Sequence, residues 1–101
     1  MRVLAALVRP IESETAYGGR AVSYEAAGTV WLACGARRQS RRTDAGEGVA
    51  RPVELMKADC RVDARVTPGR VLRFGGGDWR IEAAAPEGAP GRLALTLERV
   101  R

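Results

Sequence analysis

Apolar and polar side chains alternate along most of this chain with a period of two. The clearest case runs from Leu55 to Val66, where five charged residues alternate with apolar ones. The apolar positions are Met56, Ala58, Cys60, Val62, Ala64 and Val66, and the charged ones are Lys57, Asp59, Arg61, Asp63 and Arg65. On a helix these charges would surround the whole cylinder, so the pattern predicts a strand with one buried and one solvent-exposed face.

Shorter apolar-rich runs predict further strands. They are Val3 to Val8, Ala21 to Cys34, Val71 to Phe74, Trp79 to Ala84 and Arg92 to Arg99. In the second run we expect a bulge near Gly28 and expect Tyr24 and Trp31 to reach the core. In the last run Leu93, Leu95 and Leu97 would face inward, with Arg92, Ala94, Thr96 and Glu98 outward. Gly75-Gly76-Gly77-Asp78 provides the positive-φ positions that a tight hairpin needs.

About six hairpin-connected strands with little helix predict an all-β fold, a small antiparallel barrel or sandwich. Closure into a barrel would also remove exposed sheet edges. The 101 residues fit one domain spanning 1–101, with a long loop between the second and third main strands. That loop, Gly35 to Pro52, has no convincing period, and a loop of this length is usually functional or mobile. Glu12 to Arg20, centred on Tyr17-Gly18-Gly19, is expected to be a second, shorter hairpin loop.

Composition is that of a globular protein, with 46% hydrophobic and 29% charged residues and a formal net charge of +5. Nearly all the positive charge is arginine, since Lys57 is the only lysine. A basic surface is compatible with nucleic acid, but arginine also pairs well with carboxylates at protein interfaces. No apolar run approaches the ~18 residues of a membrane span. Val3 to Val8 is too short for a signal peptide, so we expect a cytoplasmic protein before any assembly.

The chain offers little for catalysis. It contains no histidine, the commonest general base and metal ligand. Asp59 and Asp63 share a strand face with three basic residues, which favours a ladder of charges over a metal site. Cys34 and Cys60 lack zinc-finger spacing and are expected to be buried free thiols. We therefore predict no enzymatic activity, no cofactor and no metal.

Four arginines in the long loop are the main candidate functional residues: Arg37, Arg38, Arg41 and Arg42. They could be solvated, contact DNA phosphates, or pack against acidic surfaces of a neighbouring subunit. Base stacking is weakly supported, because the chain has five aromatic residues and Trp31, Phe74 and Trp79 look needed for the core.

The order of the segments resembles a known family. In sequence, Arg-Pro-Ile-Glu stands at 9–12, Ala-Tyr-Gly-Gly at 16–19, Gly-Thr-Val-Trp-Leu-Ala at 28–33, Pro-Gly-Arg-Val-Leu at 68–72, Trp-Arg-Ile-Glu-Ala at 79–83 and Gly-Arg-Leu at 91–93. Together these segments resemble the head–tail joining (head-closure or stopper) proteins of long-tailed phages and phage-derived gene transfer agents. The middle departs from that pattern, since residues 35–54 are rich in glycine and arginine.

The resemblance implies a virion protein at the head–tail junction. Six or twelve copies would form a ring between the portal-side adaptor ring and a tail terminator or tail tube protein, around a channel for packaged double-stranded DNA. The arginine loop would face the channel or the adjacent ring, and Tyr17, Gly18, Gly19 and Arg20 would form a second contact loop. Phage, prophage and gene transfer agent remain equally open, as does whether the subunit is monomeric before docking. The alternative is a free-standing basic β-barrel that binds nucleic acid.

Overall fold

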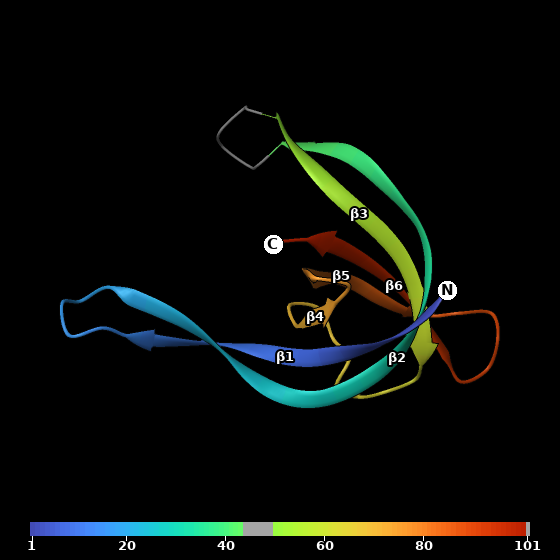
Figure 1. Cartoon of the computed structure of the whole chain (residues 1–101), viewed down its shortest axis with the longest axis horizontal. Coiled ribbons are helices and arrows are strands. Elements are labelled where there is room, and N and C mark those ends of the chain that lie inside the picture. The colour runs from blue at the N-terminus through green and yellow to red at the C-terminus, as the bar shows by residue number, and fades with distance from the viewer. Residues whose placement is uncertain (44–49, 101) are drawn as a thin grey trace.

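A computed structural model describes residues 1–43 and 50–100 of the chain. The six strands are β1 (Arg2–Glu14), β2 (Arg20–Thr43), β3 (Ala50–Arg61), β4 (Val71–Phe74), β5 (Gly77–Pro86) and β6 (Arg92–Arg99). All neighbouring strands are antiparallel, and the order β1-β2-β3-β6-β5-β4 closes into a barrel (Figure 1). The predicted all-β fold is therefore confirmed. Among the described residues, no helix could cross a membrane.

The core lies inside the barrel and is filled from alternate positions of every strand. Its largest fully buried side chain is Trp79, whose ring stacks on Phe74 with the centroids 6.0 Å apart. The inward positions predicted in the charged strand are confirmed for Met56, Ala58 and Cys60, all of which are buried. The remaining core side chains include Ala5, Leu7, Val30, Leu32, Val66, Leu72, Ile81, Leu95 and Leu97.

The positions of glycine in the sequence predicted a tight hairpin and a bulge, and the structure contains both. Gly75 and Gly76 connect β4 to β5 with φ angles of 59° and 77°, as a tight hairpin with positive φ at both central positions requires. Gly28 has a φ of 112°, and the pairing of β1 with β2 shifts register beside it, between Ala6 and Val8. The expected bulge is thus confirmed.

The charged strand ends sooner than predicted. β3 stops at Arg61, and Val62 and Ala64 are exposed, so the prediction of one strand reaching Val66 is wrong. The Asp63 carboxylate accepts a hydrogen bond from the backbone N–H of Arg65 at 2.9 Å, which stabilises a turn instead of an extended strand. Val66 then returns to the core with 3% exposure.

Two aromatic residues predicted to be buried are exposed. Trp31 is 56% exposed because its neighbours Val30 and Leu32 occupy the inward positions of β2. Tyr24 is 43% exposed because it lies in a part of β2 beyond the barrel, where Arg73 lies 4.9 Å from its ring. Arginine side chains cover part of both rings, since Arg2 lies 5.7 Å from the ring of Trp31.

The predicted irregular loop from Gly35 to Pro52 is largely strand. Residues 35–43 continue β2 and residues 50–52 begin β3, paired from Arg37↔Met56 to Thr43↔Ala50. Polar side chains on both faces of this exposed ribbon conceal the period of two that would have identified it. Residues 44–49 lie outside the described part of the chain.

Candidate interaction surfaces

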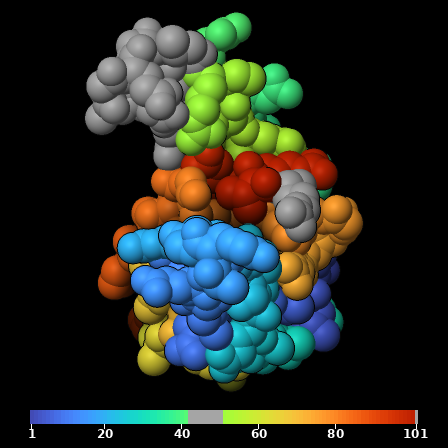
Figure 2. Space-filling model, turned by 90° about the vertical axis from the view of Figure 1, so that its left-hand side faces the viewer, coloured from blue at the N-terminus to red at the C-terminus, as the bar shows by residue number. Residues whose placement is uncertain are grey.

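Two hairpin arms extend from the barrel. The first arm comprises residues 9–14 of β1 and 20–25 of β2, which pair with each other beyond the point where β1 leaves β4 at Val8. The second arm comprises residues 38–43 of β2 and 50–54 of β3, beyond the point where β3 leaves β6 at Leu55. Figure 1 shows the first arm projecting to the left of the barrel and the second arm above it. In Figure 2 the tip of the first arm faces the viewer, below the β3 side of the second.

The tip of the first arm carries the predicted second contact loop. Tyr17 is 99% exposed, and Gly18 adopts a φ of 80° that permits the tight turn. The backbone N–H of Gly19 donates to Thr15 Oγ1 at 3.0 Å, which closes the turn. Arg20 forms an ion pair with Glu12 at 3.0 Å, and a second pair joins Arg9 to Glu25 at 3.1 Å. The turn is thus well defined, while its largest side chain contacts almost nothing in the chain.

The four candidate arginines of the second arm are not gathered into one cluster. Strand alternation places Arg37 and Arg41 on one face and Arg38 on the other. Arg38 and Arg41 are exposed and form no ion pair with any described residue. The backbone of Arg42 pairs with Arg51, but its side chain lies outside the described part of the structure.

Arg37 has a structural role at the base of the second arm. Its guanidinium lies 5.4 Å from the centre of the buried Trp79 ring, and Arg99 of β6 lies 5.9 Å from the same ring. Both arginines also lie 3.6 Å from the carboxylate of Glu54 in β3. This network joins β2, β3 and β6 over the core, so it fixes the direction in which the arm leaves the barrel.

A buried carboxylate lies on the other face of the same strands. Glu98 was predicted to face outward, opposite Leu97, and it is nevertheless only 1% exposed. It accepts a hydrogen bond from Arg80 at 2.9 Å and one from Arg51 of the second arm at 3.3 Å. Arg80 also bonds Glu82 at 2.9 Å, which raises the pKa of the guanidinium. Sequence alternation alone could not show that long arginine side chains fold over this position.

Both cysteines are free thiols. Cys60 is buried and Cys34 is partly buried, and burial raises the pKa of both thiols. No group of three or more histidine, cysteine, aspartate or glutamate side chains in residues 1–43 and 50–100 could hold a metal ion. The outward carboxylates are instead paired with arginines, Asp59 with Arg92 and Asp63 with Arg65.

Comparison with solved structures identifies proteins of the same fold. The chain is similar to a chain in the virion of a native gene transfer agent particle, with a TM-score of 0.71 and 23% identity over 97% of this chain and 94% of the other. It is also similar to the protein XkdH of the phage-like element PBSX from Bacillus subtilis, with a TM-score of 0.59 and 9% identity. That match covers 99% of this chain and 96% of the other. No family model and no curated protein matches the chain.

The chain therefore shares its fold with a chain of a gene transfer agent virion and with a protein of a phage-like element. The resemblance predicted from the order of the sequence segments is confirmed at this level, since one neighbour is a chain of a gene transfer agent virion and the other is a protein of a phage-like element. The matched regions include nearly the whole chain, so the likeness covers the barrel together with its connections.

Proposed function

We propose that this chain is a non-enzymatic virion component that forms a ring at the head–tail interface, where it closes the DNA-filled head and docks the tail. The observation that supports this most directly is the fold shared with a chain of a gene transfer agent virion over 97% of this protein. Six or twelve copies would be arranged by rotation, each using one surface against a different surface of its neighbour. The portal-side adaptor ring and a tail terminator or tail tube protein would contact the two faces of the ring.

The first arm supports this proposal because its edges are unprotected. Beyond Val8, β1 pairs only with β2, and β2 pairs with β3 only from Ala33 onward. Residues 9–14 and 20–25 of the first arm therefore have no further strand paired at either edge within the described chain. Proteins usually cover such edges, and contact with the next subunit of a ring would do so. Tyr17 at the tip would be an anchor for that contact, because tyrosine is enriched at interfaces.

The second arm is suited to reach the channel or the adjacent ring. Its base is fixed over Trp79, while Arg38 and Arg41 are exposed on opposite faces of the ribbon. Cations on both faces could contact DNA phosphates and an acidic protein surface at the same time. Packaged DNA would then pass through a channel lined by copies of this arm.

Quantitative mass spectrometry of nuclease-treated, density-purified particles tests the proposal. We expect this chain at about six or twelve copies per particle, the number that the family resemblance implies, together with portal and tail proteins. Its absence from intact particles, with abundant protein in the soluble fraction, would contradict the ring. Particles from cells that lack this chain are the matched control, and we expect their heads to lose DNA.

A second candidate is a free-standing β-barrel that binds nucleic acid through the second arm. The exposure of Arg38 and Arg41, without ion pairs among the described residues, favours it. A DNA titration of the isolated protein at low and raised salt separates the two functions. Tight binding that weakens steeply with salt would favour the free-standing barrel.

A further inference from the structure

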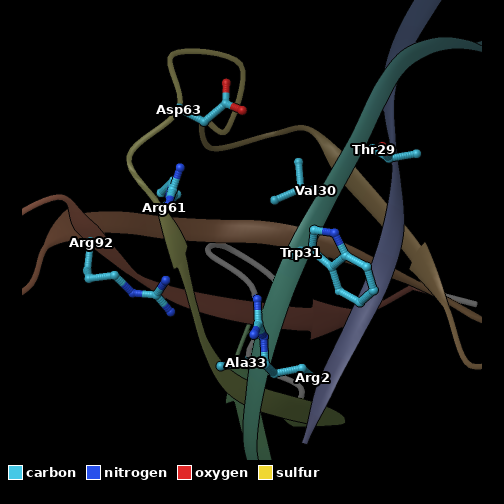
Figure 3. Close-up of a pocket in the computed structure, with 8 residues that line it drawn as sticks. All are labelled: Arg2, Thr29, Val30, Trp31, Ala33, Arg61, Asp63 and Arg92. Atoms are coloured by element: carbon cyan, nitrogen blue, oxygen red, sulfur yellow. The ribbon is translucent and has the colours of Figure 1, made fainter.

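A pocket at one end of the barrel carries a separate concentration of positive charge. Its volume is about 390 Å³, and it is lined by Arg2, Thr29, Val30, Trp31, Ala33, Arg61, Asp63 and Arg92. These residues come from the start of β1, the middle of β2, the end of β3 and the turn after it, and the start of β6. In Figure 3 the side chains of Arg61, Asp63 and Arg92 lie across the pocket from β2, and Val30 points toward them. The pocket is distinct from both arms.

The carboxylates near the pocket already form ion pairs with arginines. Asp63 lies 2.7 Å from Arg65, and the hydrogen bonds from Arg65 lower the pKa of Asp63 to about 2. Asp59 forms an ion pair with Arg92. Arg2 and Arg61 form no ion pair with any residue of the described chain, although Arg2 contacts the Trp31 ring. The pocket therefore presents two cations whose charge is not balanced locally.

The register of the sheet places like charges opposite each other here. Arg61 and Arg92 are direct cross-strand partners at the end of the β3–β6 pair. Like charges in this position repel and destabilise the sheet. Within the described residues only Arg92 has a carboxylate partner, Asp59. A carboxylate bound between the two guanidinium groups would relieve the repulsion and could accept hydrogen bonds from both.

Apolar surface accompanies this charge. Val30, Trp31 and Ala33 line the pocket, and Trp31 has 56% of its surface exposed. Tryptophan and arginine are the residues most enriched among the few that dominate binding energy at protein interfaces. A peptide with an acidic residue followed by an aliphatic residue could contact both the charged and the apolar surface of the pocket.

We propose that this pocket binds an acidic peptide segment of another protein, with a carboxylate between Arg61 and Arg92 and a neighbouring aliphatic side chain against the exposed ring of Trp31. A recess of about 390 Å³ accommodates one or two side chains. Duplex DNA is a stiff cylinder that presents its phosphates along the outside, so it fits protruding cations such as those of the second arm better than a recess. The inference rests on the chemistry of the pocket and does not require the ring.

Nuclear magnetic resonance of the full ¹⁵N-labelled chain tests it, because the protein has two tryptophans in opposite environments. Trp31 lines the pocket and is 56% exposed, whereas Trp79 is 1% exposed in the core. A Trp31→Phe variant assigns the two indole N–H signals. The probe is a capped six-residue peptide of alternating glutamate and leucine, and its control is the same peptide with glutamine for glutamate. We expect the glutamate peptide to shift the Trp31 signal saturably and leave that of Trp79 in place.

Matched arginine variants locate the binding. We expect Arg61→Ala to weaken binding of the glutamate peptide about tenfold, the effect of losing one charged hydrogen bond. Arg2→Ala should weaken it as well. Arg20→Ala removes the same charge at the tip of the first arm, where the side chain is 76% exposed, and should leave affinity nearly unchanged. A heteronuclear spectrum of each variant shows that its fold is intact.

Four results would overturn the proposal. They are an unmoved Trp31 signal, an equal shift with the glutamine peptide, equal losses in Arg61→Ala and Arg20→Ala, and a shift by a short DNA duplex at lower concentration than by the peptide. The last would make the pocket a nucleic-acid site. Because none of these measurements uses particles, their failure is distinguishable from failure of the ring.

Discussion

Glu98 and Arg80 are direct partners across β5 and β6, and the Glu98 carboxylate accepts a hydrogen bond from Arg80 Nη2 at 2.9 Å although its side chain is only 2% exposed. Arg51 of β3 bonds the same carboxylate at 3.3 Å. One buried anion therefore links the second arm to the barrel. Burial of a carboxylate is tolerated when charged hydrogen bonds of this kind satisfy it.

We expect Glu98→Gln to destabilise the protein by about 2 kcal/mol, less than the 3–5 kcal/mol typical of a broken, fully buried pair. The cost is lower because the Arg80 and Arg51 side chains are 42% and 46% exposed and can turn toward water. Urea denaturation measures the free energy of unfolding. Glu87→Gln, at an exposed position after β5, is the control and should change it by less than about 0.5 kcal/mol.

The neighbouring residues Arg37 and Arg38 should respond differently to replacement by alanine. Arg37 contacts the Trp79 ring and lies 3.6 Å from Glu54, so Arg37→Ala should cost about 1 kcal/mol of stability. Arg38→Ala removes the same charge from an exposed side chain, and its free energy of unfolding should stay within about 0.5 kcal/mol of the wild-type value. Urea denaturation followed by tryptophan fluorescence measures both. Equal effects would show that Arg37 does not stabilise the base of the arm.

Gly28 should not tolerate a side chain. Its φ of 112° is strained for any other residue, and a Cβ there would lie 2.2 Å from Arg65 Nη1. Arg65 would have to move, which would break its hydrogen bonds to the carbonyl oxygens of Ala27 and Thr29 at 3.0 and 3.3 Å. We expect Gly28→Ala to cost about 2 kcal/mol. Gly88→Ala, where a Cβ meets nothing within 4 Å, is the control and should be neutral in thermal unfolding.

The Asp63–Arg65 pair predicts a pH dependence of stability. Arg65 lowers the pKa of Asp63 in the folded protein from 3.8 to about 2. The unfolded chain therefore takes up the proton first, so the pair stabilises the fold above pH 3.8 and this contribution disappears as the pH falls toward 2. We expect the free energy of unfolding of the wild type to be about 1 kcal/mol larger than that of Asp63→Asn at pH 6, after allowance for solvent screening.

Urea denaturation of both proteins between pH 6 and pH 2.5 measures that difference. The two free energies of unfolding should converge as the pH falls. A difference that stays constant with pH would mean that the Asp63 hydrogen bonds, and not its charge, stabilise the turn.

Much of the fold could be predicted from the sequence, because strands with one buried face record their orientation as a period of two. Met56, Ala58 and Cys60 are buried as that period requires, and Gly75 and Gly76 form the expected hairpin. The same signal was absent from residues 35–43 and 50–52, since a two-stranded arm has no fully buried face. Periodicity therefore predicted the barrel but not the second arm.

The candidate surfaces were less predictable because they depend on contacts between distant segments. The sequence groups four arginines, but alternation separates Arg38 from Arg37 and Arg41, and Arg37 contacts the core through Trp79. The basic pocket gave no local signal, since Arg2, Arg61 and Arg92 are brought together only by the closed sheet. Of the predicted contact residues, Tyr17 lies at an exposed tip, and its role in a contact stays a prediction.

Tyr17 provides the sharpest test of the ring, because its side chain is 99% exposed and contributes little to folding. We expect Tyr17→Ala to leave the free energy of unfolding within about 0.5 kcal/mol of wild type. If the tip anchors a neighbouring subunit, the variant should lose about 2 kcal/mol of contact energy at each interface. The repeated loss around a ring should then sharply lower the number of copies per purified particle, measured by mass spectrometry. Val62→Ala, at a site 59% exposed in the turn after β3, is the control and should be incorporated like wild type. Normal incorporation of Tyr17→Ala would mean that the first arm contacts no neighbour through its tip, even if the protein is in the particle.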